Sequence, residues 1–224
     1  RYSVTEQDVV CLGREEGGVR IAAETADGGP LAVTVPSEAE YQQRNAAVAI
    51  RAMSVLRRSG VCRFSPEDAA RGIRRFAWPG RMEEVLPGVF LDGANNPDGI
   101  QTFLSSVAAR ETKQERLLLF SAAADKDTCR MAELLAGSGL FCLAAVTAMD
   151  SGRSMDAGSL RAVAGILNGK GQKEPLVFDR SDRALEWLLK LQKDRKAEIY
   201  IVGSLYLAGE IVRYAEEKRE VYYD

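Results

Sequence analysis

A repeated alternation of strand-like and helix-like segments, beginning near residue 84, constrains the fold more than any other feature. Short apolar runs predict strands at 89–91, 117–120, 141–146, 176–178 and 199–202. Helical patterns follow them near 97–109, 128–136, 156–168, 181–193 and 205–219. Parallel strands need long crossover connections, which are usually helices. The alternation therefore predicts an α/β domain with a Rossmann-like, mostly parallel sheet and helices on both faces.

The preceding part of the chain has a different pattern. Three short strands are expected near 9–12, 19–22 and 31–35, separated by glycine-rich turns. A long helix is then expected from a cap at Ser37 to about Ser59. Its predicted apolar side consists of Tyr41, Ala46, Val48, Ala49, Ala52, Met53, Val55 and Leu56.

A second helix is predicted to start at Ser65, where a capping residue is followed by a proline and two acids. The Trp78-Pro79-Gly80 sequence breaks that helix. We place the domain boundary there, which divides the chain into residues 1–78 and 79–224.

Composition excludes several classes of function. With 46% hydrophobic residues, 28% charged residues and a net charge of −2, the chain lacks the basic excess of a nucleic-acid-binding protein. Its longest apolar runs are too short to span a membrane. The four scattered cysteines argue against a disulfide or zinc framework, and we expect a cytoplasmic protein with reduced thiols. The chain has no histidine, so no imidazole can act as a base or a metal ligand.

The segment from Phe90 to Gly99 combines a strand, a turn and a helix start. The strand ends on Asp92, Asn96 suits the helix cap, and Pro97 suits the first helical position. Open α/β sheets bind ligands at such turns. Asp92 could hydrogen-bond a ribose, while Asn95 and Asn96 could meet a polar or anionic ligand at the helix N-terminus. An ordinary capped turn remains the alternative.

Three loops offer further polar groups. Arg81 follows a rigid Pro-Gly bend and could bind phosphate or stack on a base, or pair with a nearby glutamate. The Asp125-Lys126-Asp127 sequence follows a strand, and there a structural ion pair is the favoured interpretation. Ser204 caps the last helix after Gly203, so the free N–H groups of that turn could hold a carboxylate.

Gln42 and Asn45 lie three residues apart on the long helix and share a face. Together they could contact a planar hydrogen-bonding group such as a purine edge. A solvated helix face is the favoured alternative.

The order of these motifs resembles a known family. Y-Q-x-x-N-A, W-P-G-R-M-E, L-D-G-A-x-N-P-D-G, D-K-D and G-S-L-Y-L-x-G-E follow one another as in the latter half of folylpolyglutamate synthase/dihydrofolate synthase. That family belongs to the Mur-ligase-like, ATP-dependent amide ligases. The resemblance implies that residues 79–224 form its Rossmann-like C-terminal domain. Residues 1–78 would be the C-terminal portion of its central ATP-binding domain, with a small sheet and helices.

The resemblance also implies an activity. The family adds L-glutamate to the γ-carboxyl of a reduced folate, after ATP has phosphorylated that carboxylate. ATP and Mg²⁺ would serve the full-length enzyme, with L-glutamate, a reduced folate and a missing N-terminal ATPase half as partners. We find no phosphate loop or magnesium carboxylate, so the 224-residue chain alone is expected to be inactive. A sibling Mur-type ligase with another acid substrate, or a non-catalytic binding module, remains possible.

Site residues carry over by position. On the ATP side, the resemblance implies roles for Asn45 near adenine, Arg81 and, at the ribose, Asp92. On the glutamate side, it implies Asn95, Asn96, Ser204, Tyr206 and, by a weaker match, Arg153. Asn95 replaces the histidine that the family usually has in D-G-A-H-N-P. Because an amide cannot become cationic, we expect weaker affinity for a carboxylate there.

Overall fold

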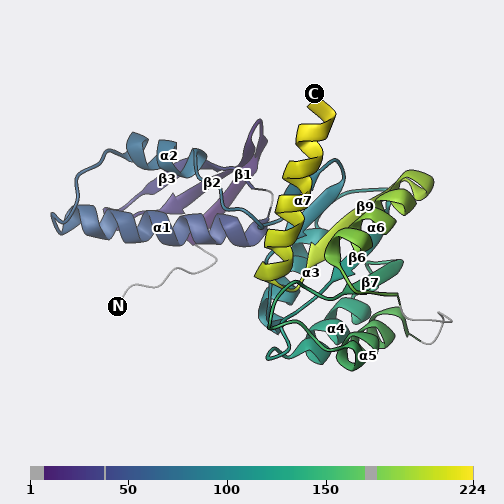
Figure 1. The fold of residues 1–224 in the computed structure, drawn as a ribbon. Coiled ribbons are helices and arrows are strands. Elements are labelled where there is room, and N and C mark those ends of the chain that lie inside the picture. Colours follow the sequence, from purple (N-terminus) through teal and green to yellow (C-terminus); the bar gives the residue numbers. More distant parts are fainter. Residues whose placement is uncertain (1–7, 38, 170–175, 224) are drawn as a thin grey trace. The chain divides into compact units, whose positions relative to one another are not determined.

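The computed structural model describes residues 8–37, 39–169 and 176–223 (Figure 1). The chain divides into two compact units, Arg1–Pro79 and Gly80–Asp224. Within the described residues, no helix has both the length and the apolar character needed to cross a membrane.

The first unit is an antiparallel sheet of three strands in the order β1-β2-β3, accompanied by two helices. The elements are β1 (Val9–Glu15), β2 (Gly18–Glu24), β3 (Pro30–Val35), α1 (Glu40–Arg58) and α2 (Pro66–Arg74). Buried and more exposed residues alternate along β2, as expected for a strand with one face on a core. That core contains Val19, Ile21, Ala23, Val33, Val35, Ala46, Ala47 and Ile50.

Helix α1 buries a different side from the one that its sequence predicts. Val48, Met53 and Leu56 of the predicted apolar side are 52%, 40% and 41% exposed. Ala46 of the predicted side is buried, together with Ala47, Ile50 and Ser54, which were not predicted. The helix is apolar on two sides, and the side with smaller residues packs against the sheet.

The start of α1 differs from expectation, whereas the start of α2 agrees with it. Ser37 is not the cap of α1, because the N-cap is Ala39, whose side chain makes no capping hydrogen bond. The predicted start of α2 is confirmed. Ser65 Oγ accepts from Asp68 N at 3.1 Å, and the Asp68 carboxylate accepts from Ser65 N at 3.0 Å.

The second unit confirms the predicted α/β fold. Its six strands lie in the order β4-β5-β9-β6-β7-β8, and all neighbours pair in parallel except β4 with β5. The strands are β4 (Glu83–Leu86), β5 (Val89–Asp92), β6 (Glu115–Phe120), β7 (Leu143–Thr147), β8 (Val177–Phe178) and β9 (Ala197–Val202). The helices are α3 (Pro97–Ala108), α4 (Thr128–Gly137), α5 (Ala157–Asn168), α6 (Ser181–Arg195) and α7 (Leu205–Tyr223).

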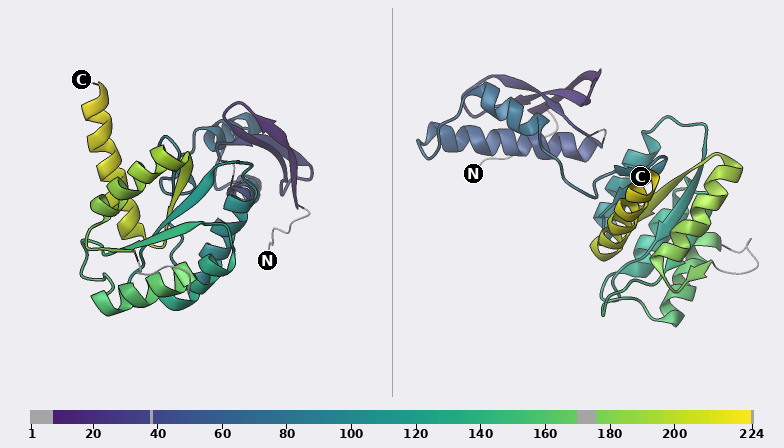
Figure 2. Two further views of the ribbon diagram at one scale, coloured as in Figure 1. Left: turned by 90° about the vertical axis from the view of Figure 1, so that its right-hand side faces the viewer. Right: turned by 45° about the horizontal axis from the view of Figure 1, so that its top comes forward.

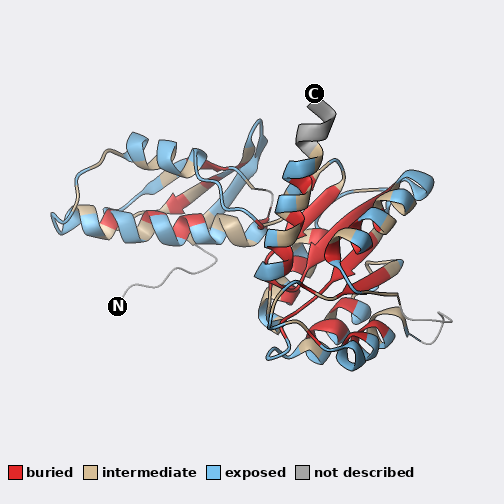
Figure 3. Ribbon diagram, in the orientation of Figure 1, coloured by how far each residue is buried: buried red, intermediate tan, exposed pale blue. Residues whose placement is uncertain are grey.

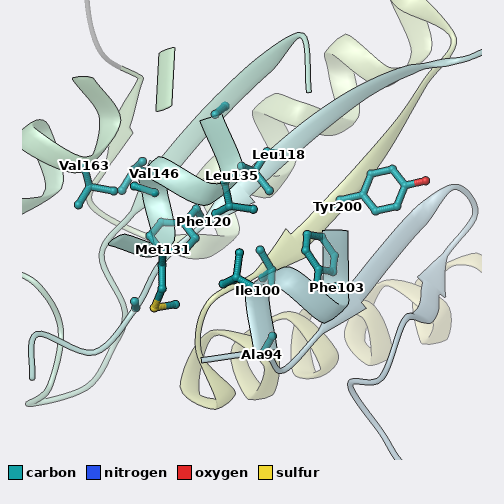
Figure 4. Packing of buried hydrophobic residues seen from close by; sticks show 14 of the residues in the cluster. Ala94, Ile100, Phe103, Leu118, Phe120, Met131, Leu135, Val146, Val163 and Tyr200 are labelled. Atoms are coloured by element: carbon teal, nitrogen blue, oxygen red, sulfur yellow. The ribbon is translucent and has the colours of Figure 1, made fainter. Parts of the chain in front are cut away.

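Helices cover both faces of this sheet (Figure 2). Residues of α3, α4 and α5 pack with one strand face, and residues of α6 and α7 pack with the other. Strands β5 and β9 are buried throughout their length, and β6 is buried over its last four residues (Figure 3). Figure 4 shows the first of these cores, where Phe103 and Tyr200 meet edge to face with ring centroids 6.4 Å apart.

The position of β9 determines where polar turns can meet. Val202, at the end of β9, pairs with Asp92 of β5 on one side and with Phe120 of β6 on the other. The three strands run in the same direction, so their carboxyl ends share one edge of the sheet. The turns that follow them therefore lie at the same edge, although β9 ends more than 80 residues after β5 and β6 in the chain.

Candidate functional site

A cavity of about 310 Å³ opens at this edge of the second unit. Its walls come from the turns after β5, β6 and β9 and from the loop between β7 and α5. The lining residues are Asn95, Ala123, Lys126, Arg153, Gly203, Ser204, Leu205 and Tyr206. Four residues predicted for the glutamate side, Asn95, Arg153, Ser204 and Tyr206, are thus brought together.

Gly203 allows the last turn to lie close to its neighbour. Its φ of +119° disfavours any residue with a side chain. A Cβ at this position would lie 2.3 Å from the carbonyl oxygen of Ser121 and 2.7 Å from a ring carbon of Phe120. Glycine is therefore required at position 203, where the turn after β9 lies against the turn after β6.

Ser204 caps α7, and its hydroxyl can also donate a hydrogen bond. Its Oγ accepts from Tyr206 N at 3.1 Å, and the residue is 4% exposed. A hydroxyl donates one hydrogen bond as well as accepting. The cap therefore leaves the Ser204 O–H able to donate to a ligand in the cavity.

The Asp92 carboxylate braces its own turn. Oδ1 accepts from Ala94 N at 2.9 Å and Oδ2 accepts from Met82 N at 3.1 Å, while Gly93 N donates to Gly80 O at 2.7 Å. Asp92 is 2% exposed. These bonds tie the end of β5 to the segment that precedes β4, so the structure gives Asp92 a structural task. Its contact with a ribose stays a prediction.

The other residues of the predicted site lie outside the cavity. Asn96 caps α3, accepting from Gly99 N at 2.8 Å, and is exposed. Arg81 is half-buried, and its Nη1 lies 3.7 Å from where a Cβ of Gly93 would be. Asn45, in the first unit, is exposed and donates to Gln42 Oε1 at 3.0 Å. That bond confirms that Gln42 and Asn45 share a helix face.

Arg153 is held at the cavity by two partners. Its guanidinium lies 2.5 Å from Asp125 Oδ2 and 5.9 Å from the centre of the Tyr206 ring. Hydrogen bonding to Tyr206 and then to Asp125 raises the pKa of Arg153. The hydrogen bond from Arg153 lowers the pKa of Asp125 in turn. Both groups are therefore charged at neutral pH.

The three residues of the Asp-Lys-Asp sequence make separate contacts, which differ from the predicted ion pair within the motif. Asp125 pairs with Arg153, and Asp127 caps α4 by accepting from Arg130 N at 3.1 Å. Lys126 lines the cavity and is exposed. Lys126 was not predicted as a site residue, because its charge was assigned to an ion pair within the Asp-Lys-Asp motif.

The cavity is rich in hydrogen-bond donors. Arg153 and Lys126 supply positive charge, Ser204 and Tyr206 supply hydroxyls, and Asn95 supplies an amide. Such a set suits a small anionic molecule, above all a carboxylate, which Arg can bind through two parallel hydrogen bonds. Among the described residues, no group of three His, Cys, Asp or Glu side chains is placed to hold a metal ion.

Comparison with known proteins identifies relatives by sequence. No family model matches the chain. It is 32% identical over 120 residues to folylpolyglutamate synthase of Lacticaseibacillus casei, a match that covers 53% of this chain and 28% of that protein. It is 28% identical over 176 residues to dihydrofolate synthase/folylpolyglutamate synthase of Bacillus subtilis, covering 76% and 38% of the two chains.

A relative with a different substrate also matches. The UDP-N-acetylmuramoyl-L-alanyl-D-glutamate–2,6-diaminopimelate ligase of Caulobacter vibrioides is 28% identical over 167 residues, which cover 70% of this chain and 34% of that ligase.

The fold is found in solved structures. Folylpolyglutamate synthase of Mycobacterium tuberculosis, complexed with ADP and AMPPCP, matches with a TM-score of 0.80 at 23% identity, over 94% of this chain and 48% of that one. The chain thus spans less than half the length of each of these relatives.

Proposed function

Since this chain belongs to the folylpolyglutamate synthase/dihydrofolate synthase family, we propose that it is part of an ATP-dependent ligase that adds L-glutamate to the γ-carboxyl of a reduced folate. The observation that carries the proposal is the cavity beside β5, β6 and β9. It combines two cations, two hydroxyls and an amide in a chain whose relatives include several folate ligases.

The cavity would hold the incoming glutamate. A glutamate molecule carries two carboxylates, and the cavity offers Arg153 and Lys126 as cations. Ser204 O–H and the Asn95 amide would donate further hydrogen bonds to the same carboxylates. These residues bind glutamate and orient it, so that its amine faces the activated carboxyl of the folate.

In the proposed reaction, ATP phosphorylates the folate γ-carboxylate. The amine then attacks the carbonyl carbon, a tetrahedral intermediate forms, and phosphate leaves as the amide bond is made. In this reaction the chain binds glutamate, and its sequence contains no phosphate loop. We assign Mg²⁺ to the missing part of the ligase, because no described group of side chains here suits it.

ATP would be the co-substrate, as the ADP and AMPPCP complexes of the Mycobacterium tuberculosis relative suggest. The resemblance assigns Asn45, Arg81 and Asp92 to the nucleotide. Arg81 is the strongest of the three, because its guanidinium is half-buried beside the Gly93 turn. Asp92 would act by shaping that turn, since its carboxylate already accepts two backbone N–H groups.

The rest of the ligase would cover the exposed apolar side of α1. Val48, Met53 and Leu56 follow one side of this helix and are 40% exposed or more. Contiguous apolar surface of this kind is typical of protein interaction sites. We therefore infer that the missing ATPase half packs there, and that the 224-residue chain alone does not release phosphate from ATP.

A titration of the chain with L-glutamate, followed by amide NMR shifts, tests the proposal. We expect shifts at Asn95, Arg153 and Ser204 that saturate, and weaker binding in Arg153→Ala. Arg161→Ala removes an exposed arginine of α5 that is not part of the cavity, and serves as the matched control. Uniformly small, non-saturating shifts, or equal binding by Arg153→Ala and Arg161→Ala, would refute the assignment.

A second candidate is a Mur-type ligase that adds a different amino acid. The Caulobacter vibrioides relative favours it, whereas Asn95, which stands where the family usually has histidine, favours a binding module that has lost catalysis. Titration with meso-diaminopimelate decides between the two. Tighter binding of diaminopimelate than of glutamate would support this second candidate. A natural, longer protein that binds glutamate yet releases no phosphate from ATP with any folate would be a binding module.

A further inference from the structure

Glu210, the last residue of the G-S-L-Y-L-x-G-E motif, does not line the cavity but lies on α7 behind it. Its side chain is half-buried. Oε1 accepts from Asp150 N at 2.8 Å, and Oε2 accepts from the hydroxyl of Ser181. Ser181 is the first residue of α6 and is 7% exposed. One carboxylate thus joins α7, the start of α6 and the loop that follows β7.

That loop is internally bonded. Met149 N donates to Ser154 Oγ at 3.0 Å, Ser154 N donates to Ser151 O at 3.0 Å, and Arg153 N donates to Ser151 Oγ at 3.2 Å. A loop closed in this way moves as one body. A displacement at Asp150 is therefore passed on to Arg153.

The loop has a second attachment near the cavity. Ala124 N donates to Arg153 O at 2.9 Å, and the Arg153 guanidinium reaches Asp125. With Glu210 at one end and residues 124–125 at the other, the loop is fixed on two sides. The bridge between Ala123 and Ser154 and the buried Met149 side chain also hold the loop, so removing the Glu210 attachment loosens it chiefly at Asp150.

We propose that Glu210 is a positioning residue that fixes the loop of residues 149–154 and thereby sets the place of the Arg153 guanidinium at the cavity. The effect on glutamate binding rests on the function proposed above, whereas the effect on the loop does not. A carboxylate is suited to this place because it lies at the N-terminus of α6, where the helix dipole favours negative charge.

Three substitutions separate positioning from a general loss of stability. Glu210→Ala removes both acceptors. Glu210→Gln keeps both contacts, because the amide oxygen accepts from Asp150 N while the Ser181 hydroxyl turns to accept from the amide NH₂. Glu216→Ala removes an exposed glutamate from the same helix and is the control.

The first measurement is NMR of the chain without ligand. In Glu210→Ala we expect faster exchange of the Asp150 amide and loss of the Tyr206 ring-current shift on the Arg153 side chain. Both signals should stay unchanged in Glu210→Gln and Glu216→Ala. Unchanged Arg153 signals in Glu210→Ala would overturn the proposal. Glu210→Asp, whose side chain is one methylene too short, is judged by the same criteria should Glu210→Ala fail to fold.

The second measurement is the affinity for L-glutamate. We expect a dissociation constant about tenfold higher in Glu210→Ala, the equivalent of one lost charge-assisted hydrogen bond, and no change in Glu216→Ala. Rescue by Glu210→Gln would support positioning. Equal affinity in Glu210→Ala and the unsubstituted chain would overturn it. An unsubstituted chain that binds no glutamate refutes the proposed function, and the ligand-free spectra then still decide the role of Glu210.

Discussion

Replacing Gly203 with alanine should destabilise the second unit far more than the same change at another glycine with positive φ. The added Cβ would lie 2.3 Å from the Ser121 carbonyl oxygen and 2.7 Å from the Phe120 ring. Both neighbours belong to the end of β6 or the turn after it, which pairs with β9. The Ser121 carbonyl belongs to the backbone and cannot move without disturbing that pairing, and the Phe120 ring is fully buried in the core.

The cost can be worked out from two contributions. Backbone strain at a φ of +119° costs about 1–3 kcal/mol for a residue with a Cβ. Overpacking against backbone and an aromatic ring adds about 1–3 kcal/mol. Together these contributions predict a loss of about 2–6 kcal/mol. Domains of this kind are stable by only about 5–15 kcal/mol, so the loss is a large share of the total.

Gly139 provides the matched control. Its φ is +64°, and a Cβ there would have no atom within 4 Å, so Gly139→Ala should cost only about 1–2 kcal/mol of strain. Urea unfolding in a Trp78→Phe background reports on the second unit through Trp187, whose ring packs 5.7 Å from Phe178. Losses that agree within about 0.5 kcal/mol between the two variants would refute the reasoning, since it rests on the close approach at Gly203.

Three further outcomes are expected. Because Arg153 lowers the pKa of Asp125, their pairing is complete above the ordinary aspartate range, near pH ~4, and is lost as pH falls through the lowered pKa. A carboxyl NMR titration should therefore give a higher midpoint for Asp125 in Arg153→Ala, and equal midpoints would contradict the pairing. Ser65→Ala removes the hydroxyl of the capping box and should cost the first unit about 1 kcal/mol, seen as faster amide exchange in the first turn of α2. Unchanged exchange would show that the cap contributes nothing. Arg110→Ala should cost about 2 kcal/mol in urea unfolding, because it removes the cation 3.2 Å from Glu198, which is 6% exposed and keeps the hydrogen bond from the Tyr200 hydroxyl. A cost below about 1 kcal/mol would mean that water replaces the guanidinium.

The strand and helix order of the second unit could be predicted because each element follows its own local pattern. Strand β4 could not be predicted, because its first two residues are glutamates and only Val85 of its four residues is buried. The buried side of α1 was predicted wrongly for a related reason. The helix is apolar on two sides, and no local pattern tells which of them packs against the sheet.

The candidate site depends on contacts between distant residues, which limits what sequence can predict. Asn95 and Ser204 were predicted from their motifs and Arg153 from a weaker positional match. The place of β9 between β5 and β6 brings the turns of Asn95 and Ser204 together, and the loop after β7 adds Arg153. Lys126 was missed because the partner of Asp125 lies 28 residues away, outside the motif. Asp92 was identified, but its burial follows from the segment at Met82 that folds over it.

The central place of β9 also bears on how the second unit is made. Strand β9 is the last in the chain, yet it fills the gap between β5 and β6, where Ile199 pairs with Val89 on one side and Leu117 on the other. During synthesis, β5 and β6 emerge first and leave two unpaired apolar edges facing an open slot. Such edges invite pairing with other chains until the slot is filled. The pairing edges of β5 and β6 therefore stay open until β9 has been made.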